Sequence, residues 1–368
     1  MLTQRISVLA IPLSLVACGG SSPSAEPPAQ PIATSAAPAL AHDAPSANAV
    51  AAPAPTASPK PSLIELEKES IAKLIAAFKS HDPKAVAALY EEGASMQSPG
   101  PDGWDETKGR SDIEARHAGL FAAFPDLDFA VTRAFANGDT VAIEWVASGR
   151  NDGAWMGGAA TGKRFGLSAA SLLTFDADGL FVSDRVYMDE VTVAIQLGKA
   201  KGKARTMPMI PTTDPVWTVA GGTPEEAALV DITKNNWPAM WSKKDAAGYE
   251  NAFTPDAVHR EIASPNDFAG KKALMAEYDM YAGSVPDMSV SVDRIFTAGN
   301  FAILEFTFGG TQKGPLGPLK PTGKKFTLHG LDVDEFQDKR YSSANSYSNA
   351  REFLTQLGAI PRPSLARK

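Results

Sequence analysis

The chain lacks the residues on which several classes of site depend. Only one cysteine, Cys18, occurs in 368 residues, so no disulfide can form within the chain. The sequence contains no Cys/His or His/Glu spacing typical of a metal site. It also has no glycine-rich phosphate loop and no nucleophile elbow. The sequence therefore predicts neither a metal nor a cofactor.

Positive charge is also scarce. The formal net charge is −7, and no long basic stripe is present. Binding to nucleic acid depends on clustered Lys and Arg, so we expect no nucleic-acid partner. The one basic run, residues 199–205, lies beside Pro208, Pro211 and Pro215 and is interpreted as a solvated linker.

The first eighteen residues have the pattern of an export signal. Arg5 precedes an apolar run over residues 6–16, which is too short to cross a membrane as a helix. The closing tetrapeptide, Leu15 to Cys18, resembles the lipobox of bacterial lipoproteins, which implies lipidation of Cys18 and a membrane anchor. Gly19 stands where an aspartate would signal inner-membrane retention. We therefore expect a cell-envelope location, at the outer membrane facing the periplasm if the organism is Gram-negative.

Residues 19–61 are mostly Ala, Pro and Ser, with charges at Glu26, Asp43 and Lys60. Such a segment buries too little apolar surface to offset its ordering entropy. The sequence predicts a disordered tether here.

The rest of the chain contains one pattern twice. The first copy is marked by Pro125-Asp126, Asn137-Gly138, Thr161-Gly162-Lys163, Tyr187 and Gln196-Leu197-Gly198. The second copy is marked by Pro286-Asp287, Gly299-Asn300, Thr322-Gly323-Lys324, Tyr347 and Gln356-Leu357-Gly358. The offset is 161 at the Pro-Asp pair (286 − 125) and 160 at the last glycine (358 − 198). The sequence thus predicts a duplicated domain, over residues 62–200 and 223–362, with a linker over 201–222.

Periodicity indicates the order of elements in each repeat. Ile64, Ile71 and Leu74 fall on one helical face. Asp82-Pro83 predicts a second helix extending to Tyr90, and Ser111 with Glu114 predicts a capping box for a third. After Pro125 the period changes to two, which indicates antiparallel strands. Helices followed by a sheet indicate the α+β class.

Here the chain resembles a known family. Pro125-Asp126, the Gly149 to Gly153 strand end, Thr161-Gly162-Lys163 and the segment from Val186 to Gly198 are similar to the SnoaL-like group. This group comprises polyketide cyclases and ester-cyclase-like proteins of the nuclear transport factor 2-like superfamily. The resemblance implies two tandem cone-shaped α+β barrels, each with an apolar cavity. It does not imply one function, because the fold hosts cyclases, isomerases, hydrolases and binding modules.

In the cyclases of this family, an aspartate near the end of the sheet acts as general acid/base without a cofactor. By position, the resemblance implies this role for Asp189, with the Tyr187 hydroxyl orienting the substrate. The alternative is that Asp189 only caps the last helix, because its duplicate is Asn349, which caps a helix but cannot act as a base. The family histidine of the Gly-Thr-His-x-Gly stretch is missing from both repeats. His329 is a further candidate, although its counterpart in the first repeat is Ser168.

A second set of side chains is expected to contact a ligand. An aromatic-lined cavity suits a flat apolar molecule. The candidates are Trp104, Phe121, Trp145, His259, Phe306 and Tyr347. Two hypotheses follow: a tethered protein that binds a small apolar molecule, or a cofactor-free cyclase or isomerase that uses Asp189. Because domains of this fold often pair through their sheets, we also expect an intrachain pseudo-dimer.

Overall fold

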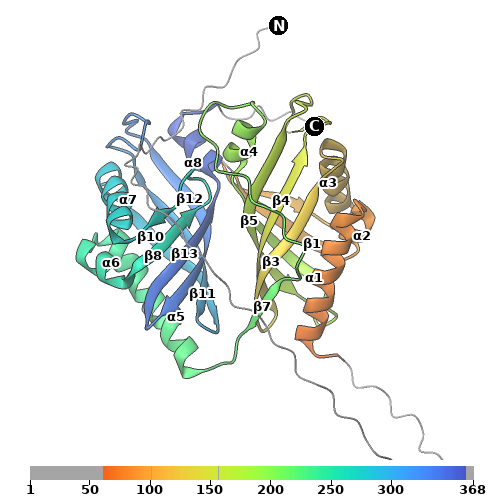
Figure 1. Ribbon diagram of the computed structural model, residues 1–368, viewed down its shortest axis with the longest axis horizontal. Helices are drawn as coiled ribbons and strands as arrows, with labels where there is room; N and C mark the ends of the chain where they lie inside the picture. Colours follow the sequence, from red (N-terminus) through yellow and green to blue (C-terminus); the bar gives the residue numbers. More distant parts are fainter. Residues whose placement is uncertain (1–60, 101, 156, 362–368) are drawn as a thin grey trace, which may run out of the picture. The chain divides into compact units, whose positions relative to one another are not determined.

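The computed structural model describes residues 61–100, 102–155 and 157–361 (Figure 1). The predicted signal segment with its lipidation site Cys18, and the predicted tether up to residue 60, lie outside these described residues. Within the described part, no helix is long and apolar enough to cross a membrane. Two sheets are present, each accompanied by its own helices, so the predicted α+β class with two tandem domains is confirmed.

The first domain begins with two helices and ends with a short one. Its elements are α1 (Leu63–Lys79), α2 (Pro83–Ala87), β1 (Tyr90–Gly100), β2 (Gly103–Lys108), α3 (Arg110–Ala123), β3 (Asp128–Asn137), β4 (Thr140–Arg150), β5 (Arg164–Phe175), β6 (Phe181–Tyr187) and α4 (Glu190–Gln196). The strand order is β2-β1-β6-β5-β4-β3-β7, where β7 is Val216–Val219. Strands β3 to β6 pair antiparallel, and β1 joins β6 in parallel.

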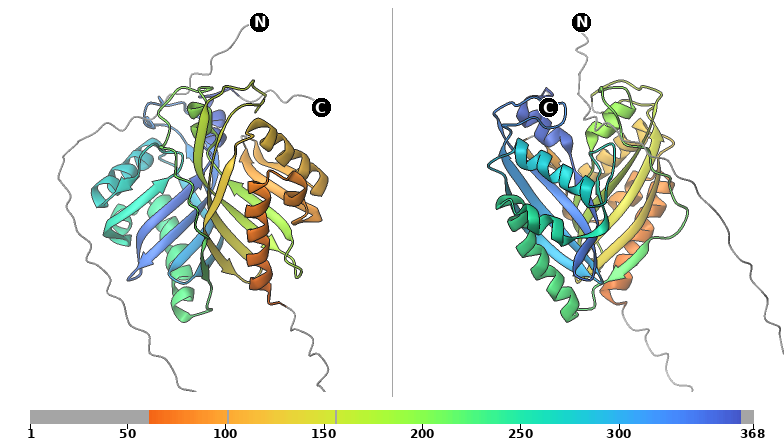
Figure 2. Two further views of the ribbon diagram at one scale, coloured as in Figure 1. Left: turned by 45° about the vertical axis from the view of Figure 1, so that its right-hand side comes forward. Right: turned by 60° about the vertical axis from the view of Figure 1, so that its left-hand side comes forward.

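The second domain repeats this order. Its elements are α5 (Pro224–Trp237), the π-helical turn η1 (Pro238–Ser242), α6 (Ala246–Ala252), β8 (Phe253–Glu261), β9 (Phe268–Ala269), α7 (Lys271–Ser284), β10 (Ser289–Ala298), β11 (Phe301–Thr311), β12 (Lys325–Gln337), β13 (Arg340–Ser348) and α8 (Ala350–Leu357). The strand order is β10-β11-β12-β13-β8-β9, which, read from the other end, matches the first sheet without its added edge strand. Figure 2 shows the two sheets from two further directions.

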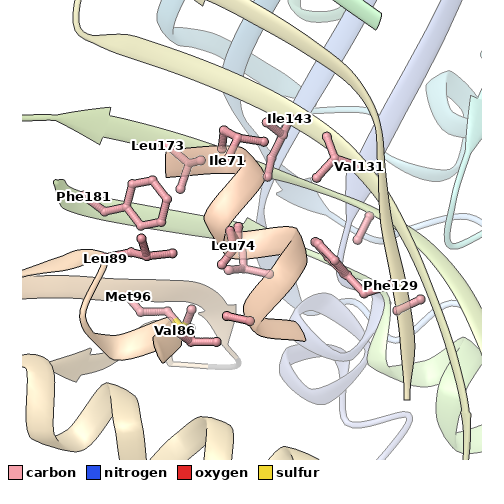
Figure 3. Packing of buried hydrophobic residues seen from close by; sticks show 14 of the residues in the cluster. Ile71, Leu74, Val86, Leu89, Met96, Phe129, Val131, Ile143, Leu173 and Phe181 are labelled. Carbon is pink, nitrogen blue, oxygen red and sulfur yellow. The ribbon is translucent and has the colours of Figure 1, made fainter. Parts of the chain in front are cut away.

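The core of the first domain lies between α1 and the sheet. Ile71 and Leu74 of α1 point towards Ile143, Leu173 and other apolar strand residues (Figure 3). These side chains are nearly inaccessible to solvent. Burial of the predicted apolar helical face thus fixes α1 on the sheet, as the periodicity predicts.

Two predictions about local structure are wrong. The second helix ends at Ala87 rather than Tyr90, because the Tyr90 backbone begins β1 and pairs beside Phe181. The third helix begins at Arg110, after Gly109 with φ of 83°, so Ser111 lies inside the helix and caps nothing. The capping boxes start α1 and α5 instead. The segment between the repeats also contains β7, which pairs in parallel with β3.

The residues shared by the two repeats hold the scaffold. Asp126 accepts a hydrogen bond from the backbone N–H of Arg150, and its duplicate Asp287 accepts one from Thr311. The Gln196 side-chain amide both donates to and accepts from the backbone of Gly166. Its duplicate Gln356 makes the same pair of bonds to Thr327. These duplicated residues therefore hold equivalent loops and strand ends in the two domains.

Candidate functional site

The first domain encloses a cavity of about 440 Å³ between its helices and its sheet. Most of the lining is apolar and much of it is aromatic, including Phe78, Phe129, Trp145, Trp155 and Phe165. The titratable side chains of the lining are Tyr90, Arg116, His117, Asp184 and Glu190, and three of them, Tyr90, His117 and Asp184, are almost fully buried.

Asp184 is the more deeply buried of the two acids that line this cavity, the other being Glu190. The alternation of β6 places Asp184, Val186 and Met188 on the cavity side of the strand. The Tyr90 hydroxyl donates to Asp184 Oδ2 at 2.8 Å, while Oδ1 has no hydrogen-bond partner of normal geometry. Burial raises the pKa of Asp184 to about 6, and nearby hydroxyls of Tyr90 and Ser171 limit the rise. The carboxyl group therefore changes protonation close to neutral pH.

His117 is the second polar group of the lining. It lies on α3, and its Nδ1 is 2.8 Å from the carbonyl oxygen of Ile113, one turn earlier. Burial lowers the pKa of His117 to about 4, so the ring is neutral at physiological pH.

Asp189 and Tyr187 lie on the opposite side from Asp184. The Asp189 carboxylate accepts hydrogen bonds from the backbone N–H groups of Val191, Thr192 and Ala350, at 3.3, 2.8 and 3.1 Å. It is not among the residues that line the 440 Å³ cavity. Burial raises the pKa of Asp189, and the amides that it accepts from oppose the rise. These contacts are those of a helix cap, and we do not propose Asp189 as a general base.

Tyr187 is instead part of a reciprocal contact between the repeats. Its hydroxyl donates to Glu305 of β11 at 2.6 Å, and the duplicate Tyr347 donates to Glu144 of β4 at 2.7 Å. The two glutamates are themselves duplicates (305 − 144 = 161). Arg185 donates to Glu305 at 3.0 Å, and Arg133 forms an ion pair with Glu144. Burial, and then the neighbouring glutamate, raise the pKa of both tyrosines well above the usual value.

The caps repeat this reciprocity. Asp189 accepts from the backbone of Ala350, and its duplicate Asn349 accepts from Glu190, the duplicate of Ala350. The sequence analysis does not predict the role of the two glutamates. The signal was available, because Glu144 and Glu305 interrupt apolar strands at the same position of each repeat.

His329, the further candidate, has Glu352 as its partner. Its Nδ1 is 2.5 Å from Glu352 Oε1, and its ring centroid is 5.3 Å from that of Trp104. The hydrogen bond to Glu352 raises the pKa of His329. His329 lines neither the 440 Å³ cavity nor the cavity of the second domain.

The six predicted ligand-contacting residues divide into two groups. Trp145 lines the first cavity, whereas His259 and Phe306 line the second. The other three line neither cavity. Trp104 lies against Tyr187 and His329, Phe121 is in the core beside Phe78, and Tyr347 donates to Glu144.

The cavity of the second domain is smaller, about 90 Å³, and its chemistry differs. One cause of the smaller volume is the replacement of Ala147 by its duplicate Phe308, which lines the second cavity. Four carboxylic acids line it, Glu261, Glu277, Asp332 and Asp334. Within the residues that the structure describes, no three His, Cys, Asp or Glu side chains are grouped so as to hold a metal ion.

The position of the family histidine has a structural role in both repeats. Asn151 occupies it in the first repeat, and its amide oxygen accepts from the backbone of Thr161 at 3.1 Å. Gln312 occupies it in the second and accepts from Thr322 at 2.8 Å. Each amide closes the loop that follows, and neither side chain lines a cavity.

Comparisons with known proteins agree with this architecture. A family model described as SnoaL-like polyketide cyclase matches residues 69–197 and 233–357. No curated protein matches the chain significantly. IdmH from Streptomyces antibioticus, a candidate polyketide cyclase, is 29% identical, with 36% of this chain and 98% of IdmH covered and a TM-score of 0.32. TsrD from Streptomyces laurentii is 22% identical, with coverages of 36% and 97% and a TM-score of 0.34. An LEH-like epoxide hydrolase from M. tuberculosis is 18% identical, with coverages of 37% and 88% and a TM-score of 0.31.

Proposed function

Because the chain belongs to the SnoaL-like polyketide cyclase family in both of its repeats, we propose that its first domain binds a small apolar molecule. The observation that carries this proposal is the cavity of about 440 Å³ with its aromatic lining. Cavities of this size that are mostly apolar with few polar groups are typical of small-molecule sites. The buried Asp184 carboxyl group in the lining, whose Oδ1 has no hydrogen bond of normal geometry, suits a ligand that carries one hydroxyl or carbonyl group.

The test uses the duplicate as a guide. We would titrate 2-naphthol, a flat molecule with one hydroxyl, and follow quenching of the fluorescence of Trp145 and Trp155, which line the cavity. Ala147→Phe places the second repeat's residue in the first cavity and should abolish saturable quenching. The matched control is Ala344→Ser, which changes the lining of the second cavity and should leave binding intact. Equal quenching in wild type and Ala147→Phe would contradict the proposal.

A second candidate function is favoured by Asp184 itself. A carboxyl group with a pKa of about 6 in an apolar cavity is suited to removing a proton next to a carbonyl group. In this candidate Asp184 is the general base, and the Tyr90 hydroxyl holds its other oxygen.

The reaction would be measured as solvent deuterium exchange at the carbon next to the carbonyl of 2-tetralone, followed by NMR. Wild type should accelerate the exchange, with a rate that increases as pH rises through about 6. Asp184→Asn should remove the acceleration, and Asp189→Asn should not. Exchange at the buffer rate with wild type would rule out the enzyme and leave the binding function.

We also propose that the chain is held in the cell envelope through a lipid on Cys18. The lipobox-like tetrapeptide and the Ala/Pro-rich segment that follows it support this location. Wild type should partition with membranes and incorporate labelled fatty acid, whereas Cys18→Ala should do neither. Incorporation in Cys18→Ala would contradict the proposal.

The reciprocal contacts also support an intrachain pseudo-dimer of the two domains. Each domain supplies one glutamate and one tyrosine to the pair of Tyr–Glu hydrogen bonds. The arrangement is the intramolecular equivalent of a twofold interface. A double-mutant cycle on Tyr347 and Glu144 should give a coupling of about 1 kcal/mol or more, and its absence would argue against the pairing.

A further inference from the structure

The second domain has a cavity whose buried acids exceed its buried bases. We propose that this cavity is a second ligand site, of a different class from the first, that binds a small organic cation such as an alkylammonium ion. The proposal stands on three features of the lining: unpartnered carboxylate oxygens, aromatic walls and the particular pattern of substitutions relative to the first repeat.

The carboxylates come first. Asp332 and Asp334 of β12 line the cavity, and their exposed fractions are 2% and 1%. Asp332 Oδ1 and both oxygens of Asp334 have no hydrogen-bond partner of normal geometry. The Ser346 hydroxyl near Asp332 and the Trp237 indole N–H near Asp334 are close enough only to limit the rise of the two pKa values. Carboxylates so weakly paired at this depth are costly, and a cation in the cavity would stabilise them.

The one basic side chain of the lining, His259, already has partners for both of its ring nitrogens. His259 Nδ1 is 2.8 Å from Glu277 Oε2, and its Nε2 is 2.8 Å from the Ser346 hydroxyl. One imidazolium therefore stands against four acids in the lining. The negative charges of Asp332, Asp334 and Glu261 must therefore be neutralised by bound protons or by a cationic ligand.

The walls favour an organic cation. The aromatic lining consists of Trp237, Trp241, Tyr249, Phe253, Tyr281, Phe306, Phe308 and Tyr341. Aromatic faces attract alkylammonium groups through cation–π interactions, and they offer apolar contact to the methyl groups. A bare metal ion would find no group of three suitable ligands among the described residues.

The site is particular to the second repeat. The positions of Asp332 and Asp334 are Ser171 and Leu173 in the first repeat, at the same offset of 161. Asp184 of the first repeat lies beside Met96 on the neighbouring strand, whereas at the equivalent place in the second repeat Ala344 lies beside His259. Both repeats thus have an aromatic-lined cavity, but the buried acids Asp332 and Asp334 occur only in that of the second.

Protons compete with the ligand for these acids. Burial raises the pKa values of Glu261 and Asp332 to about 7 and that of Asp334 well above the usual range. For His259, burial alone would lower the pKa, but Glu277 raises it to about 9. The titratable groups facing the site are His259 and Glu261 of β8, Glu277 and Tyr281 of α7, Asp332 and Asp334 of β12, Tyr249 of α6 and Tyr341 of β13. Cation binding should therefore release protons.

The probe is tetramethylammonium, whose charge does not depend on pH, titrated into the full chain and followed by calorimetry. We expect saturable binding that is about tenfold tighter at pH 8 than at pH 6, for displacement of one proton from a group of pKa about 7. Proton release would be measured separately in buffers of different ionisation enthalpy. tert-Butyl alcohol, which has a similar shape and no charge, should bind at least about tenfold more weakly.

Two variants separate this site from the first cavity. Asp332→Asn with Asp334→Asn should weaken tetramethylammonium binding at least about tenfold, because it removes the charge and keeps the shape. The matched control Asp184→Asn removes the buried acid of the other cavity and should leave this binding unchanged. The proposal is refuted by any of three results with wild type. These are no saturable binding of tetramethylammonium, binding of tert-butyl alcohol as tight as that of tetramethylammonium, or binding of K⁺ to the same site as tightly as tetramethylammonium in a competition titration. It is also refuted if the folded double variant binds as wild type does, and proton release by wild type tests it even if that variant fails to fold.

Discussion

Replacing Asp184 by asparagine should stabilise the protein above pH 6 and leave its stability unchanged near pH 4. The carboxyl group is fully enclosed, and burial raises its pKa from 3.8 to about 6. A shift of about 2 units corresponds to about 3 kcal/mol of stability lost once the group ionises in the folded state. Asparagine keeps an oxygen that can accept from the Tyr90 hydroxyl, so the geometry of that hydrogen bond is retained.

The sign follows from the direction of the shift. A carboxyl group whose pKa is raised in the folded state binds its proton more tightly there than in the unfolded state. Its contribution to the free energy of unfolding is therefore present in full below the unfolded pKa of about 4. The contribution is lost as pH rises through about 6. Asp184→Asn removes this dependence, so the difference in unfolding free energy between variant and wild type should grow from near zero at pH 4 to about 2–3 kcal/mol at pH 8.

The assay is urea unfolding of the full chain at intervals between pH 4 and pH 8, followed by tryptophan fluorescence. Other buried acids also titrate in this range, and Glu67 has a pKa raised to about 7 by burial. Only the difference between variant and wild type therefore isolates Asp184. Asp231→Asn, on the exposed face of α5, is the control and should give a flat difference. A constant destabilisation of Asp184→Asn at every pH would refute the reasoning.

Three further outcomes are expected from urea or thermal unfolding. Tyr187→Phe should cost about 1–3 kcal/mol because it leaves the buried Glu305 without its 2.6 Å donor; no loss would show that the bond is not needed. Asp189→Asn should change stability by less than about 1 kcal/mol, since Asn349 caps the equivalent helix; a larger loss would indicate that the charge matters there. Gly153→Ala should destabilise by more than about 2 kcal/mol because the added Cβ would overlap a backbone carbonyl of α3, and a neutral result would show that the loop can move away.

The sequence was sufficient where a pattern is local and repeated. The offset of 160 to 161 residues predicts two domains, and the period-two strands after Pro125 predict the sheets. The family match covers both repeats, and scaffold residues such as Asp126 and Gln196 make equivalent backbone contacts in each copy. The sequence predicts the ends of the elements less well. For example, the residue before the third helix is Gly109, whereas the sequence pattern favours Ser111.

The candidate site was predicted less well, because which side chains of a strand point into the cavity depends on what packs against each face of the sheet. Tyr187 and Asp189 alternate with Asp184 and Met188, so one choice of face decides both sets. The family resemblance favours the first set, but the other domain packs against that side and supplies Glu305 to Tyr187. Asp184 is not predicted from the sequence, because its duplicate is Ala344 and it belongs to no repeated motif.

The sequence by itself thus determined the duplication, the α+β class, the scaffold motifs and the family, since these depend on spacing and alternation along the chain. Tertiary structure alone decided which face of each sheet encloses a cavity and which is occupied by the contacts of Glu144 and Glu305. It also decided that Asp184 is buried in the lining of the first cavity and that an acid cluster lines the second. Strand β8 brings Glu261 to that cluster, α7 brings Glu277, and β12 brings Asp332 and Asp334. The physical reason is that burial and charge pairing are set by neighbours in space, and these neighbours are distant in the chain.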